Sequence, residues 1–124
     1  MRLLLDTNAF LWWRDGSRRL SARMRDAIRN PDNDVSVSIV SLWEIAIKRG
    51  IGKLRFQEDF REVMAEEAFN LMSIAYPHLH TLESLPLHHR DPFDRMLIAQ
   101  SVAEDLPIVT NDKKFALYDV KTLW

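Results

Sequence analysis

Cysteine is absent from this 124-residue chain. Disulfide bonds, zinc sites built on thiolates and cysteine nucleophiles are therefore excluded, and the absence fits a reducing compartment such as the cytosol. Glycine is almost as scarce, with three residues. Three are too few for a glycine-rich phosphate loop, and the chain has no Walker loop, dinucleotide-binding glycine fingerprint or G-x-S-x-G nucleophile elbow.

Long apolar runs are also missing. The run from Leu3 to Leu5 is followed at once by Asp6 and is far too short for a secretory signal. No segment approaches the roughly eighteen apolar residues that span a bilayer. The formal net charge is −1, without the positive excess of many nucleic-acid-binding domains. We therefore expect a soluble, cytoplasmic protein with no membrane partner.

The pattern of apolar residues predicts alternating strands and helices. Residues 1–124 suit a single domain with a self-sufficient core, and 47% apolar residues with balanced charge argue against disorder. Strands that alternate with helices predict an α/β fold, a three-layer α/β/α sandwich with a mostly parallel sheet of four to five strands. Four strands are predicted, at residues 2–5, 34–39, 71–75 and 108–110. A fifth strand, at residues 120–123, is left open. The predicted helices cover residues 22–29, 41–50, 57–69, 77–84 and 91–106.

Four carboxylates stand where predicted strands end or predicted helices begin: Asp6, Glu44, Asp94 and Asp112. In a parallel sheet the carboxyl ends of the strands share one edge, and open α/β sheets bind ligands just outside it. Acids gathered there repel one another unless a divalent cation neutralises them, and hard carboxylate oxygens favour Mg²⁺ or Mn²⁺. The pattern therefore predicts a metal-dependent hydrolase, in which an ion lowers the pKa of a bound water and stabilises a departing oxygen.

Each acid also has a purely structural interpretation. Glu44 has the spacing from Ser41 of a helix capping box, Asp94 lies where a helix starts, and Asp112 lies in a turn sequence. Asp6 is the hardest to explain in this way, because an acid directly after three leucines is costly to bury without partners. The prediction of a site therefore depends on the four acids together.

The other polar and aromatic groups favour structural roles. The four histidines lack an i, i+4 zinc pair with a third ligand. The aromatic residues, Trp43 among them, suit the core or a subunit contact better than base stacking. Basic residues cluster at 14–29 and 48–55. Each cluster suits a solvated helix face, although basic rims around an acidic pit also suit a phosphodiester.

Four segments, in order along the chain, resemble the motifs of PIN-domain ribonucleases, in particular the VapC-like toxins of type II toxin-antitoxin pairs: LLLDTN, SIVSLWEIAIK, RDPFDRMLIAQS and PIVTNDKKF. The resemblance runs through essentially the whole chain, and one mild departure is Ser101, where alanine is usual. It implies catalytic roles for the four acids and supporting roles for four neighbours, Thr7, Asn8, Asp91 and Thr110.

What the resemblance implies is a PIN-like nuclease that cleaves single-stranded RNA with Mg²⁺ or Mn²⁺. It also implies a homodimer that a cognate antitoxin holds inactive. We assign Asp6 and Asp94 as the principal metal ligands, with Glu44 holding the metal or orienting the water. Asp112 completes the cluster, directly or through water, and Thr110 orients a carboxylate.

Two alternatives remain open from the sequence. A receiver-like phosphotransfer domain also places acids around magnesium, but it needs an acceptor aspartate after a central strand, and the strand at 71–75 is followed by Tyr76 and Pro77. A catalytically silent module of the same fold, which binds RNA or antitoxin, is the second alternative. Its expected signature is the loss of an acid, whereas all four are present.

Overall fold

Five parallel strands form the centre of the computed structural model, which describes residues 1–124. The strands are β1 (Arg2–Leu5), β2 (Asp34–Ser38), β3 (Asn70–Met72), β4 (Ile108–Val109) and β5 (Thr122–Leu123). Their spatial order is β3-β2-β1-β4-β5, so β1 is the central strand and pairs with β2 and β4. The predicted parallel sheet is confirmed, and the strand left open by the sequence is present.

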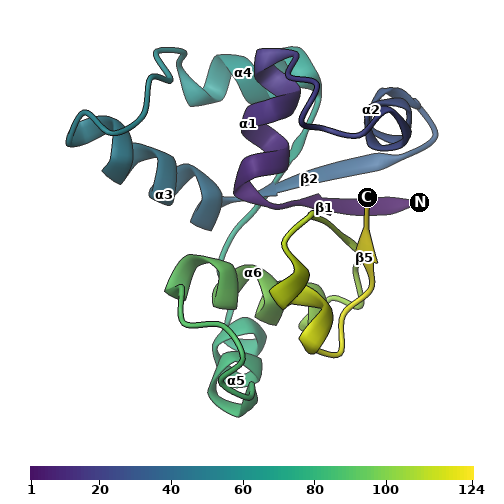
Figure 1. The fold of residues 1–124 in the computed structure, drawn as a ribbon, viewed down its shortest axis with the longest axis vertical. Coiled ribbons are helices and arrows are strands. Elements are labelled where there is room, and N and C mark those ends of the chain that lie inside the picture. The colour runs from purple at the N-terminus through teal and green to yellow at the C-terminus, as the bar shows by residue number, and fades with distance from the viewer.

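Six α-helices and one 3₁₀ turn connect the strands. The helices are α1 (Thr7–Asp15), α2 (Ala22–Arg29), α3 (Ile39–Gly50), α4 (Phe60–Glu67), α5 (Tyr76–Ser84) and α6 (Pro92–Ala103), and the turn is η1 (Lys113–Leu117). In Figure 1, α1, α2 and α4 lie on one side of the sheet, and α5 and α6 lie on the other. The three-layer α/β/α arrangement is therefore confirmed. None of the helices has the length and apolar character needed to cross a bilayer.

β1 is buried on both faces, which explains its unbroken run of leucines. Leu3 and Leu5 belong to the core cluster shared with α1 and α2, whereas Leu4 belongs to the cluster shared with α6. Successive side chains of a strand point to opposite faces, so a strand covered on both sides needs apolar residues at every position. This burial fixes the position of Asp6, the next residue in the chain.

α1 begins directly at the end of β1, where the sequence analysis predicts no helix. Asp6 caps this helix, because its Oδ1 accepts a hydrogen bond from the backbone N–H of Ala9 at 2.7 Å. Gly16 ends the helix with a φ of 65°, in the left-handed region that favours glycine. A strand that passes into a helix without a loop leaves no turn signal between them, which is why the pattern did not reveal α1.

The start of α3 also differs from the prediction. β2 ends at Ser38, whose hydroxyl caps α3 by accepting a hydrogen bond from the N–H of Val40 at 3.0 Å. Ser41 and Glu44 therefore lie within the helix, so the capping box assigned to them is wrong. Glu44 lies in the second turn rather than the first, and its carboxylate is available for other contacts.

Several further elements are shorter than predicted, most clearly α4 and β3. α4 begins at Phe60 rather than at residue 57, because Asp59 caps it by accepting a hydrogen bond from the N–H of Glu62 at 3.1 Å. β3 covers Asn70–Met72 rather than the predicted residues 71–75, and it lies at one edge of the sheet. Neither difference moves a residue of the predicted site.

Candidate active site

The four predicted acids meet at the carboxyl edge of the sheet. They come from four separate segments, after β1, in α3, in α6 and after β4. A cavity of about 190 Å³ at this edge has no hydrophobic residue in its lining, which consists of Asp6, Thr7, Asn8, Glu44, Lys48, Asp91, Asp94 and Asp112. The structure thus brings together all of the predicted site residues in the lining except Thr110, which is buried and forms a hydrogen bond with Asp6.

Asp6 is the most deeply buried acid of the cavity, with 5% of its surface exposed. Burial raises its pKa to about 6, because an ionised carboxyl loses the solvation of water. Hydrogen bonds from Thr110 and from the backbone of Ala9 oppose this shift, and the charges of Asp112 and Glu44 add to it. A nearby cation would therefore stabilise the ionised form of Asp6.

Glu44 is held between a hydroxyl and an ammonium group. Thr7 Oγ1 lies 3.0 Å from Glu44 Oε1 and also 3.0 Å from Ser41 Oγ. Lys48 Nζ donates to Glu44 Oε2 at 2.7 Å, and this contact raises the pKa of Lys48. Lys48 is a residue of the site that the sequence analysis assigned only to a basic cluster. Its spacing of four residues from Glu44 on one helix was the available signal.

Asp91 and Asp94 lie at the start of α6. Asp91 caps the helix, because its Oδ1 accepts a hydrogen bond from the N–H of Asp94 at 3.0 Å. Burial is the main cause that raises the pKa of Asp94 to about 7, followed by the negative charge of Asp91. Asp91 therefore has a structural role as the cap of α6, and it also adds negative charge beside Asp94.

His89 is the second residue of the site that the sequence analysis did not assign. Its Nε2 lies 3.0 Å from Asp94 Oδ2 and 3.2 Å from Asp112 Oδ2. These three atoms lie within 4.8 Å of one another, a spacing at which they could hold a metal ion. No linear pattern predicts this cluster, because His89 and Asp112 are 23 residues apart and meet only in the folded chain.

The charge balance of the cavity fits a divalent cation. Five carboxylates line it against the single ammonium group of Lys48. Two of those carboxylates, Asp6 and Asp94, have raised pKa values, mainly because burial removes water from them and additionally because neighbouring acids repel their charge. Hard oxygen donors of this kind favour Mg²⁺ or Mn²⁺ over thiophilic metals.

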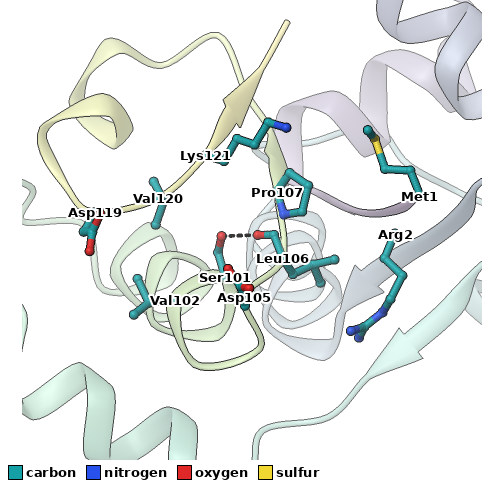
Figure 2. Close-up of a pocket in the computed structure, with 10 residues that line it drawn as sticks. All are labelled: Met1, Arg2, Ser101, Val102, Asp105, Leu106, Pro107, Asp119, Val120 and Lys121. Atoms are coloured by element: carbon teal, nitrogen blue, oxygen red, sulfur yellow. Dashed lines mark hydrogen bonds between the residues drawn. The ribbon is translucent and has the colours of Figure 1, made fainter.

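A larger cavity of about 800 Å³ lies at the opposite edge of the sheet, at the amino ends of β1, β4 and β5 (Figure 2). Its lining mixes both charges, with Arg2 and Lys121 against Asp105 and Asp119. Ser101, the mild departure from the expected motif, lies here, and its hydroxyl donates a hydrogen bond to the carbonyl of Leu106. The serine therefore lies far from the acidic cavity and is satisfied locally.

The fold and the cavity define a small α/β protein with an acidic site at the carboxyl edge of a parallel sheet. A model of the PIN domain matches residues 3–121, so the chain belongs to the PIN domain family. This family assignment excludes the alternative of a receiver-like phosphotransfer domain. No curated protein sequence matches the chain.

Several solved structures share this fold, among them a toxin-antitoxin complex from Klebsiella pneumoniae. VapBC2 from Rickettsia felis, bound to a DNA fragment from its promoter, matches with a TM-score of 0.70 and 15% identity over 100% of this chain and 99% of that chain. FitAcB from Neisseria gonorrhoeae matches with a TM-score of 0.67 and 18% identity, covering 98% and 96%. DNA-bound VapBC from Salmonella typhimurium matches with a TM-score of 0.66 and 13% identity, covering 99% and 97%. At these identities the likeness shows the fold.

Proposed function

We propose that this protein is a Mg²⁺- or Mn²⁺-dependent endoribonuclease that cleaves single-stranded RNA and acts as the toxin of a type II toxin-antitoxin pair. The observation that carries the proposal is the cavity in which Asp6, Glu44, Asp94 and Asp112 converge, in a chain of the PIN domain family. Structural neighbours from toxin-antitoxin systems support the biological role. The proposed RNA substrate fits a cytoplasmic protein.

The contacts of each residue indicate its role in hydrolysis. Asp6 and Asp94 would hold the metal, because burial deprives both carboxylates of water and a bound cation would favour their ionised forms. Glu44 is fixed by Thr7 and Lys48 and orients the attacking water. Asp112 completes the cluster, and Asn8 lines the same cavity. When bound, a divalent cation lowers the pKa of the attacking water and neutralises charge that develops on the phosphate.

Cleavage of labelled RNA tests the activity. The purified chain is incubated with labelled total RNA with Mn²⁺ or with a chelator, beside the Asp94→Asn variant as a folded control. We expect fragments only from the wild-type chain with metal. Binding of RNA without cleavage under Mn²⁺ would instead favour the catalytically silent module.

The proposed partners are a cognate antitoxin and a second copy of the chain. Exposed apolar residues recur every four positions along α3 and its C-cap: Ile39, Trp43, Ile47 and Ile51. Trp43 is 56% exposed although its ring packs edge-on against Phe93. Exposed apolar surfaces of this kind often mark protein interfaces, so we assign this face of α3 to the homodimer. Copurification with the product of the adjacent reading frame tests the antitoxin.

A further inference from the structure

We propose that His89 is a positioning residue of the acidic cavity, which joins Asp94 and Asp112 through its Nε2–H and sets the spacing of these two carboxylates. The proposal rests on the metal-dependent function given above. It adds a residue outside the four acids and their predicted neighbours.

His89 is the link between two parts of the site that are distant in the sequence. Asp94 belongs to the first turn of α6, and Asp112 follows β4 and caps η1. The Oδ2 atoms of both residues lie within hydrogen-bond distance of the same Nε2 atom, at 3.0 and 3.2 Å. A single imidazole N–H placed between them offsets their mutual repulsion and holds them close together.

The second ring nitrogen indicates which role the imidazole has. The backbone N–H of Asp91 points to His89 Nδ1 at 3.3 Å, so Nδ1 accepts a hydrogen bond. A neutral imidazole that accepts at Nδ1 carries its proton at Nε2. Nε2 then donates a hydrogen bond to Asp112 Oδ2, lies 3.0 Å from Asp94 Oδ2, and has no lone pair to offer to a metal ion. The contacts therefore favour a residue that acts through Asp94 and Asp112 over a direct ligand.

The surrounding structure holds the imidazole in place. His89 is 8% exposed, and its ring packs edge-on against that of Phe115, with the ring centroids 5.9 Å apart. Tyr118 Oη accepts hydrogen bonds from the backbone N–H groups of His88 and His89, at 2.9 and 2.7 Å. Arg95 Nη1 donates to the same Tyr118 oxygen at 3.2 Å. His89 is thus anchored through its backbone and its ring, as preorganised support of metal ligands requires.

Mn²⁺ binding to the RNA-free protein tests this role without relying on activity. Removing a group that supports metal ligands typically costs about 10- to 100-fold in metal affinity. We therefore expect His89→Ala to weaken Mn²⁺ binding by about that factor in calorimetry. His89→Gln, whose side-chain amide also donates, should recover most of the affinity. His80→Ala, at an exposed histidine of α5, is the matched control and should bind as the wild type does.

The outcomes separate this proposal from the proposed function. Wild-type affinity in His89→Ala, with the melting temperature of the metal-free variant unchanged, would overturn the role of His89 alone. Failure of the wild-type chain to bind Mn²⁺ would overturn both. Nitrogen-15 NMR of the metal-free protein gives a second readout, for which we expect the Nε2–H tautomer of His89. A proton on Nδ1 with an unprotonated Nε2 would contradict the proposal and make His89 a direct ligand.

Discussion

Asp6 has two roles that make opposite demands on its carboxyl group. As the cap of α1 it needs only an acceptor oxygen for the N–H of Ala9. As a metal ligand it must be ionised, although burial raises its pKa to about 6. An amide side chain could perform the first role but not the second, so a single substitution separates structure from function.

Asp6→Asn should therefore stabilise the metal-free protein while it abolishes RNA cleavage. The amide keeps the capping oxygen and removes a poorly solvated charge. A rise in pKa from 3.8 to about 6 corresponds to a gain of about 1 to 3 kcal/mol at pH 8. Urea denaturation at pH 8 with a chelator measures the change in the free energy of unfolding. A less stable variant, or one that still cleaves RNA, would contradict this assignment.

The raised pKa values of Asp6 and Asp94 also predict how stability depends on pH. Because both groups hold protons more tightly in the folded chain than in the unfolded chain, they favour folding fully below about pH 4. That contribution is lost as the pH rises through about 6 and about 7. Metal-free melting temperatures should thus fall between pH 5 and pH 8 in the wild type, and less so in Asp6→Asn. Mn²⁺ affinity should rise over the same interval, since protonated carboxyls cannot bind the ion.

At the scale of elements, β1 connects the core to the site. Its leucines pack against helices on both faces of the sheet, and its last residue leads directly into Asp6. The sequence predicted this strand because a fully buried strand has an unbroken apolar run. It did not predict α1, because the helix starts without a loop, nor the cap at Ser38, because this serine fits the alternating pattern of the strand predicted at 34–39.

Leu4→Ala should destabilise the fold substantially. Leu4 is fully buried in the cluster that includes Val40, Ile98 and Ile108, so truncation leaves a cavity at the centre of the sheet. Such substitutions cost about 2 to 5 kcal/mol, whereas Leu87→Ala, at a side chain that is 69% exposed, should cost little. Chemical denaturation of the two variants measures the difference. Equal stabilities would show that β1 is not packed as described.

At the scale of the whole molecule, the site exists only because parallel strands end at one edge. The sequence predicted that the four acids would meet there, since each follows a recognisable strand or lies near a helix start. The same reasoning could not find His89, whose contacts with Asp94 and Asp112 depend on how the loop before α6 folds back. The acids were predictable from topology, whereas the contacts of His89 and Lys48 with them became visible only in the packed structure.

The exposed face of α3 makes a prediction about assembly. Ile47→Asp should convert the proposed homodimer to a monomer, because it places a charge in the apolar surface that the dimer would bury. Arg23→Asp introduces an acid on α2, which lies far from α3 in Figure 1, and should leave the assembly unchanged. Light scattering after size-exclusion chromatography gives both masses. A dimeric Ile47→Asp variant would place the interface elsewhere.

The most direct test of the account is a thermal titration with Mn²⁺ of the wild-type chain and of a variant in which the four acids become amides. That variant combines Asp6→Asn, Glu44→Gln, Asp94→Asn and Asp112→Asn. Since an ion that binds only the folded state stabilises it, the wild-type melting temperature should rise with Mn²⁺ while that of the variant stays constant. Equal shifts in the two proteins, or no shift in the wild type, would contradict a shared metal site at the edge of the sheet.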